Sequence, residues 1–199
     1  VARQNALALR TPAAERERAR SGVRELRERL GLSAPPRTIE AIDVSCISGT
    51  HAVAGLVCAA DGLPRPERYR RFRIKTVEGS DDPRMMAEAV SRRYSRLKEE
   101  GGAFPDLLIV DGGITQLRAA MQALEKTGVK LPVIGLAKQH EEIVRDGQPP
   151  VFLPRDSSAL RVITALRDEA HRFAIAYHRK LRAQRIRESA LDEIPTIGR

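Results

Sequence analysis

The period of the hydrophobic pattern changes near residue 80. Before that point, three segments read as strands because they are rich in Val, Ile and Ala or alternate apolar with polar residues. They cover residues 38–45, 51–59 and 69–75. Turn signals at Ser48-Gly49 and Asp61-Gly62 separate them. These segments are therefore predicted to form an antiparallel meander.

Beyond residue 80, amphipathic helical stripes alternate with short, continuous apolar runs. The apolar runs at 106–111 and 131–137 are typical of strands buried on both faces. Helices are predicted from Asp81 to about Leu97, from about Thr115 to Lys126, and from about 157 to 188, with Asp156 or Ser157 capping the last. Residues 139–154 are expected to be a loop or a hairpin.

The resulting order, β-β-β-α-β-α-β-α, predicts an α/β fold in which a mixed sheet has helices on both faces. Three antiparallel strands come first, α/β alternation follows, and a long helix ends the domain. This order resembles the RNase H-like fold, which implies that the first strand sits centrally, beside the fourth. A charged helix over about 13–30 and the break Ser33-Ala34-Pro35-Pro36 separate a leader, residues 1–36, from a body at 37–188.

Charge is distributed unevenly over the 199 residues, whose net charge is +9. Residues 1–37 hold nine Arg against four Glu, and residues 155–188 hold nine basic against four acidic residues. Two basic helical arms that flank a neutral body favour a polyanionic partner such as nucleic acid. The alternative is that both arms are solvated helix faces with intrahelical pairs such as Glu25 with Arg29.

Composition narrows the class of protein further. Aromatic residues make up only 4% of the chain, so the core must be aliphatic and a base-stacking platform is not expected. Two cysteines, Cys46 and Cys58, fit neither a disulfide framework nor a zinc site. No run is apolar enough to cross a bilayer, so we expect no membrane partner and a cytoplasmic location.

Two carboxylates and one histidine are candidates for a catalytic metal site. Asp111 follows a buried strand and precedes Gly112-Gly113, and Asp43 interrupts the apolar run Ile42-Asp43-Val44. If the first and fourth strands are neighbours, the two carboxylates meet, and His171 lies on the helix that would supply a third ligand. Such a set could hold Mg²⁺ or Mn²⁺ for phosphodiester hydrolysis. The alternatives are a turn cap for Asp111, a solvent-facing position for Asp43 and a surface or core histidine for His171.

Several basic residues are candidates for contacts with a nucleic-acid backbone. His178 lies two helical turns from His171, too far to share a metal but close enough to line the same surface. The full set is Lys138, Arg155, Arg167, Arg172, His178 and Arg179.

Five stretches resemble the UvrC family, the incision subunit of bacterial nucleotide excision repair, over about residues 38–199. They are 40–45, Tyr69-Arg70-Arg71-Phe72, 109–113 with Gln116-Leu117, Gly135-Leu136-Ala137-Lys138, and 153–157 running into 167–174 and His178-Arg179. Two positions depart from the family pattern. Cys46 follows Asp43-Val44-Ser45 where the family usually has His, and Ile114 follows Gly-Gly where it usually has Lys.

The resemblance implies a metal-dependent DNA endonuclease domain, with Asp43, Asp111 and His171 as its catalytic set, that cuts the damaged strand on the 5′ side of a lesion. Residues 1–36 would then be a connector, and 189–199 a linker into the start of a helix-hairpin-helix module. Damaged double-stranded DNA is the implied substrate. UvrB is the implied protein partner, through a segment outside this stretch.

Three other interpretations remain open at this point. A catalytically silent DNA-binding or scaffold module would keep the basic arms but would not bind metal. A guide-strand nuclease of PIWI type also uses an Asp-Asp-His set. A phosphate-binding enzyme built on Gly112-Gly113 has little support, since no Walker lysine or dinucleotide fingerprint is present.

Overall fold

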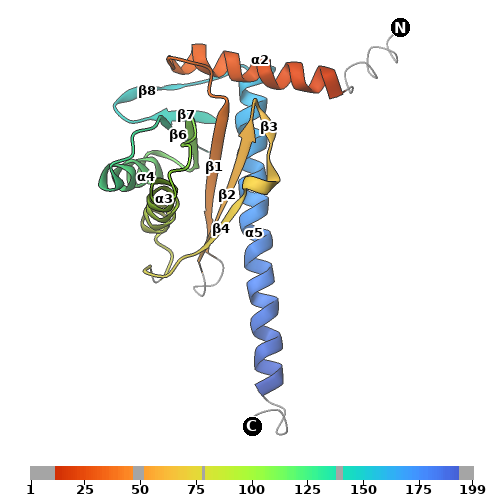
Figure 1. The fold of residues 1–199 in the computed structure, drawn as a ribbon, viewed down its shortest axis with the longest axis vertical. Helices are drawn as coiled ribbons and strands as arrows, with labels where there is room; N and C mark the ends of the chain where they lie inside the picture. Colours follow the sequence, from red (N-terminus) through yellow and green to blue (C-terminus); the bar gives the residue numbers. More distant parts are fainter. Residues whose placement is uncertain (1–11, 47–51, 78, 138–140, 193–199) are drawn as a thin grey trace.

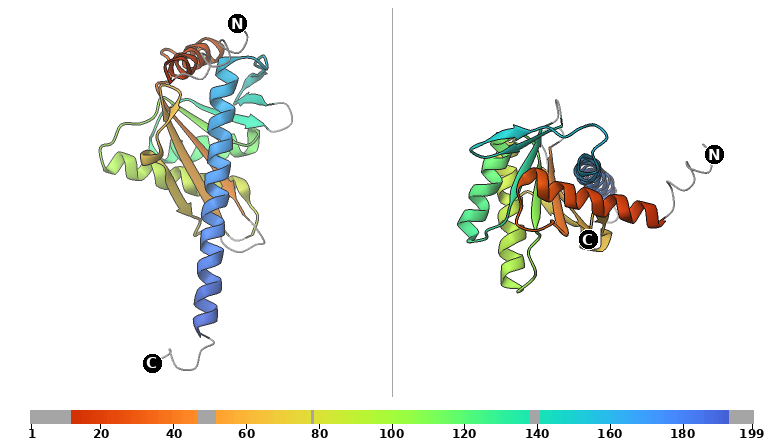
Figure 2. Two further views of the ribbon diagram at one scale, coloured as in Figure 1. Left: turned by 90° about the vertical axis from the view of Figure 1, so that its right-hand side faces the viewer. Right: turned by 90° about the horizontal axis from the view of Figure 1, so that it is seen from above.

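The computed structural model describes residues 12–46, 52–77, 79–137 and 141–192 (Figure 1). Eight strands form one mixed sheet with the order β3-β2-β1-β5-β6-β7-β8, and β4 pairs with β2. Helices cover both of its faces, as Figures 1 and 2 show. The predicted mixed α/β architecture is therefore confirmed.

The first strand occupies the centre of the sheet, as expected. β1 (Thr38–Ser45) pairs antiparallel with β2 (Val53–Ala60) on one side and parallel with β5 (Leu107–Asp111) on the other. β5 pairs parallel with β6 (Val133–Ala137). Because β1 and β5 run in the same direction, their carboxyl ends meet at one edge of the sheet, where sites of open α/β sheets collect.

The remaining strands extend the sheet at both sides. β3 (Leu63–Pro64) and β4 (Arg70–Arg73) pair antiparallel with β2, which completes the predicted meander. β7 (Glu142–Arg145) and β8 (Gln148–Val151) pair antiparallel beside β6. The segment expected to be a loop or a hairpin thus contains a hairpin.

Helices cover both faces of the sheet. α3 (Asp82–Glu99) and α4 (Ile114–Thr127) pack on one face, and α5 (Ser158–Asp192) packs on the other. α2 (Pro12–Leu30) crosses the end of the sheet and packs against α5 (Figure 1). All five residues of β5 are buried because both faces are covered, which explains its unbroken apolar run. Alternation along β1 sends Ile39 and Ala41 towards α5 and Ile42 towards α3.

α5 passes unusually close to the sheet where it crosses β2. A Cβ atom on Gly55 would lie 2.8 Å from the backbone nitrogen of Ala174, so no larger residue fits without a shift of backbone. Ser157 caps the helix, since its Oγ accepts a hydrogen bond from the Leu160 nitrogen at 3.1 Å. At its other end α5 continues to Asp192, four residues beyond the expected end at Glu188.

The leader helix α2 joins the same core as α5. Val23, Leu26 and Leu30 are buried in the cluster that also contains the α5 side chains. The Glu25 carboxylate accepts hydrogen bonds from the Ser157 hydroxyl and the Ala159 nitrogen at the start of α5. α2 therefore fixes the position of the first turn of α5, although the sequence places α2 in the leader and α5 in the body. Within the described residues, no helix is long and apolar enough to cross a membrane.

Candidate metal centre

Asp43, Asp111 and His171 come together at the carboxyl ends of β1 and β5. One ligand atom from each residue lies within 4.8 Å of the other two, close enough for all three to hold one ion. Three separate elements supply these side chains: β1, β5 and α5. The convergence expected from the order of strands is therefore present.

The register of the sheet explains why the two carboxylates are neighbours. Ile42 pairs with Val110 in the parallel β1–β5 ladder, so Asp43 and Asp111 are the next residues on each strand. Alternation places both side chains on the face that α5 covers. Asp43 is 4% and Asp111 is 7% exposed. Two like charges held this close and largely out of water are costly without a cation, so the pair fits a divalent metal.

His171 approaches this pair from α5. Its Nδ1 atom lies 2.8 Å from the Asp43 Oδ2 atom, and its side chain is 48% exposed. A histidine in the core would be covered, whereas this imidazole contacts a buried carboxylate on one side and reaches solvent on the other. It can therefore serve as a third ligand or exchange protons with a reacting group.

Arg167 lies beside the same site, one helical turn before His171. Its side chain is 15% exposed and forms ion pairs with Asp168 at 2.8 Å and Glu141 at 3.5 Å. Burial alone would lower the pKa of the Arg167 guanidinium, but the hydrogen bond and charge of Asp168, with Glu141 and Asp111, raise it. This fixed positive charge partly balances the carboxylates of the site.

The other predicted DNA contacts differ in how exposed they are to solvent. Arg155, Arg172 and Arg179 are exposed, and Arg172 forms an ion pair with Glu169 at 2.6 Å. His178 is only 6% exposed, so it does not offer the open surface expected of a backbone contact. Lys138 lies outside the described residues.

Sequence reasoning did not identify Glu141 as a neighbour of the site. Its backbone has a φ of 51°, and its carboxylate reaches Arg167 on α5. No sequence signal marks it, because its position, immediately before β7, depends on how β7 pairs with β6.

The glycine pair after Asp111 has a steric role that the sequence leaves open. Gly112 adopts a φ of 154°, and a Cβ atom there would lie 2.9 Å from the Gln116 Cγ atom. A Cβ atom on Gly113, by contrast, would meet nothing within 4 Å. The backbone beside Asp111 is thus free of bulk, which gives a large substrate clearance next to the carboxylates.

Comparisons with solved structures give only distant likenesses. Endonuclease V of Ciona intestinalis, in complex with an inosine-containing DNA, aligns with a TM-score of 0.41 at 19% identity, over 69% of this chain and 62% of that one. Kluyveromyces polysporus Argonaute with a guide RNA aligns with a TM-score of 0.32 at 11% identity, over 61% and 18% of the two chains.

Sequence comparisons are much closer. UvrABC system protein C of Methanococcoides burtonii is 46% identical over 187 residues, which cover 92% of this chain and 31% of the relative. The same protein of Salinibacter ruber is 46% identical over 189 residues, 92% of this chain and 30% of the relative. The chain thus spans about a third of the length of these relatives. The family model for the UvrC RNase H endonuclease domain matches residues 27–175, and the chain belongs to that family.

Proposed function

We propose that this chain is a divalent-metal-dependent DNA endonuclease domain that makes the 5′ incision of the damaged strand in nucleotide excision repair. The observation that carries the proposal is the convergence of Asp43, Asp111 and His171 within 4.8 Å in a chain of this family. Damaged double-stranded DNA is the proposed substrate. UvrB is the proposed protein partner, through a segment outside the nuclease domain.

The residues present fit Mg²⁺ or Mn²⁺, because carboxylate oxygens are the ligands these ions prefer. Asp43 and Asp111 would hold the ion, which supplies a water of lowered pKa and stabilises charge on the leaving oxygen. Asp43 also fixes the orientation of the His171 ring through the 2.8 Å contact. His171 then stands at the open side of the site, where it acts as a ligand or as an acid–base group.

Contacts to the DNA backbone would come from basic side chains around this site. Arg155 and Arg179 are exposed and have the reach for phosphate groups, and Arg172 would have to exchange its Glu169 partner for a phosphate. Arg167 is held by two carboxylates and lies closer to the reacting groups. Lys138, which lies outside the described residues, remains a candidate through the resemblance.

The decisive experiment replaces each carboxylate with its neutral isostere. Asp43→Asn and Asp111→Asn should abolish 5′ incision in the assembled repair complex while binding to DNA survives. A matched control is Asp61→Asn, because the Asp61 side chain is 42% exposed, forms an ion pair only with Arg37 among the described residues, and has a φ of 50° that Asn tolerates. Full incision by either site variant would contradict the proposal.

Metal titration separates this enzyme from a catalytically silent scaffold module. The departures at Cys46 and Ile114 remove a polar and a basic group near the site, so a weakened centre is the main competing interpretation. An enzyme of the proposed kind binds Mn²⁺ and loses that binding in Asp43→Asn. A silent module would show no Mn²⁺ binding in either protein.

A further inference from the structure

Arg71 shares a row of the sheet with the candidate metal centre. Gly55 on β2 pairs with Asp43 of β1 on one side and with Arg71 of β4 on the other. All three residues therefore lie on the face that α5 covers, and α5 crosses this row at Gly55, against Ala174. The metal centre and Arg71 consequently flank the same turn of α5.

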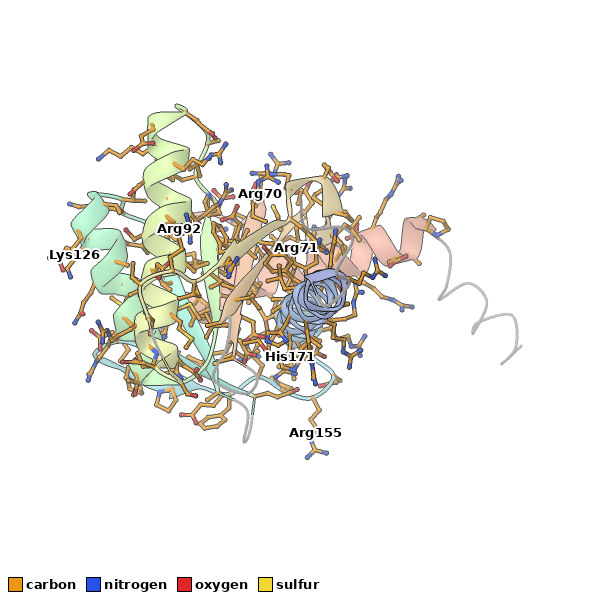
Figure 3. All side chains as sticks on the ribbon, turned by 90° about the horizontal axis from the view of Figure 1, so that it is seen from below. Arg70, Arg71, Arg92, Lys126, Arg155 and His171 are labelled. Carbon is orange, nitrogen blue, oxygen red and sulfur yellow. The ribbon has the colours of Figure 1, made fainter. Side chains whose placement is uncertain are left out.

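The side chains of α5 confirm this division into two flanks. His171 contacts Asp43 on one flank, and Phe173 contacts Arg71 on the other. Residues two positions apart in an α-helix, such as His171 and Phe173, point roughly 160° apart, which is the separation this arrangement needs. Figure 3, seen along the helix, shows Arg71 and His171 on opposite sides of α5.

Aromatic side chains hold the Arg71 guanidinium in place. Its Cζ atom lies 4.2 Å from the centroid of the Phe173 ring and 5.5 Å from that of Tyr177. Tyr69 fixes Phe173 in turn by an edge contact at 5.2 Å between centroids. These cation–π contacts use no hydrogen-bond acceptor, so the N–H groups of the guanidinium can still donate to another partner.

Arg71 differs from the neighbouring arginines in its partners. Arg172, Arg167 and Arg92 each form an ion pair with a carboxylate. Arg71 is exposed, and no carboxylate among the described residues pairs with it. A guanidinium held over aromatic rings and paired with no carboxylate is placed in advance to bind an oxyanion, and its planar fork matches a phosphate.

The same flank of α5 carries a second positive charge. Lys180 is exposed and follows Phe173 by seven residues, so it falls on the helical face that Phe173 and Tyr177 share. It lies towards the C-terminal half of the helix, which continues past the end of the sheet (Figure 2). Arg71 and Lys180 are called the far-flank pair below.

We propose that the far-flank pair binds phosphate groups of the DNA on the side of α5 opposite the metal centre, so that α5 lies between two sites of backbone contact. The proposal rests on the proposed function, since it assumes that the DNA at the metal centre extends past α5. The far-flank pair fixes the direction of the DNA across the domain, and the cleavage site selects the scissile phosphate.

The salt dependence of DNA binding tests the proposal with the whole 199-residue chain and a short duplex. Each phosphate contact contributes a slope of about −0.9 to a plot of log K against log salt concentration. Arg71→Gln and Lys180→Gln should each make the slope shallower by about 0.9, whereas Arg71→Lys should keep most of it. The matched control is Arg70→Gln, which removes the same charge from the opposite face of β4, where the Arg70 Nη1 atom donates to the Glu67 and Tyr69 carbonyl oxygens.

The outcomes distinguish this inference from the proposed function. The proposal is overturned if the salt-dependence slopes of Arg71→Gln and Lys180→Gln equal that of the unaltered chain. It is also overturned if Arg70→Gln makes the slope shallower by the same amount as they do. The surface would then serve another partner or α5 packing alone. Mn²⁺ titration of the unaltered chain and of Asp43→Asn reports separately on the metal centre. If Arg71→Gln fails to fold, the slope of Lys180→Gln decides the question, because Lys180 lies on the exposed surface of α5.

Discussion

The His171 Nδ1 atom lies 2.8 Å from the Asp43 Oδ2 atom, although the two residues are 128 positions apart in the chain. The contact joins the last helix to the first strand and brings a half-exposed imidazole to a buried carboxylate. It orients the ring, and it places His171 within reach of any cation held by the two aspartates.

Replacing His171 should weaken the metal site. We expect His171→Ala to lower the affinity for Mn²⁺ by roughly tenfold or more, because changes to groups that ligate a metal or orient its ligands cost about 10–100-fold. Isothermal titration with Mn²⁺ measures this effect. If affinity stays unchanged while one limb of the pH–rate profile disappears, His171 is an acid–base group and not a ligand. His178→Ala, at a buried position two turns away, is the control for loss of an imidazole from α5.

Replacing Gly55 with a larger residue should move α5 away from the sheet and weaken the candidate metal centre, although none of its three candidate ligands is altered. Gly55→Ala places a Cβ atom 2.8 Å from the Ala174 nitrogen, a backbone atom that cannot rotate away. Overpacking of this kind costs about 1–3 kcal/mol. Chemical denaturation should show that loss, and Mn²⁺ titration should show weaker binding because His171 moves with the helix.

Gly147→Ala is the comparison for the Gly55 experiment. Gly147 has a φ of 66° at the hairpin turn, and a Cβ atom there meets nothing within 4 Å. Its replacement should cost only the strain of the left-handed conformation, about 1 kcal/mol, and leave metal affinity unchanged. Equal metal affinity in both variants would show that the close approach at Gly55 does not position His171.

On the face of β1 that α3 covers, a buried ion pair should make the protein sensitive to removal of one of its two charges. Glu40 is fully buried, and its carboxylate accepts hydrogen bonds from the Arg93 guanidinium and, at 2.9 Å, from the Tyr94 hydroxyl. Arg93→Met should lower the free energy of unfolding by about 3–5 kcal/mol because it leaves a buried charge uncompensated. Thermal and urea denaturation measure the change.

The double variant Glu40→Gln/Arg93→Met tests the cause of that loss. Once the carboxylate is neutral, most of the stability should return. A double variant as unstable as Arg93→Met would assign the effect to lost packing of the arginine stem instead of to the buried charge.

Glu88 should give the fold part of its sensitivity to acid. Burial raises the pKa of this carboxyl, but hydrogen bonds from Thr76, Lys75 and Arg92 outweigh burial and lower it below its usual 4.5. A lowered pKa means that Glu88 stabilises the fold above pH 4.5 and that this contribution is lost as the pH falls through the folded-state pKa. Between pH 7 and pH 3, the free energy of unfolding should therefore fall less steeply for Glu88→Gln than for the unaltered protein. An unchanged pH dependence would remove Glu88 from the acid response.

The order of elements and the two carboxylates of the candidate metal centre followed from the sequence because both depend on local patterns. Unbroken apolar runs mark strands buried on both faces, and a polar residue at the end of such a run lies at the sheet edge. Parallel pairing of the first and fourth predicted strands then suffices to bring Asp43 and Asp111 together. Family motifs added His171, which the helical pattern alone could not distinguish from a surface residue.

Only the tertiary structure decided which side chains of α5 face which neighbours. His171 and His178 lie two helical turns apart and were expected to line one surface, yet His171 is half-exposed beside Asp43 and His178 is buried. The close approach at Gly55 fixes the rotation of the helix, and that rotation turns Phe173 towards Arg71. Sequence period determines which residues share a helix face, but the direction in which that face points is a property of packing between elements distant in the chain.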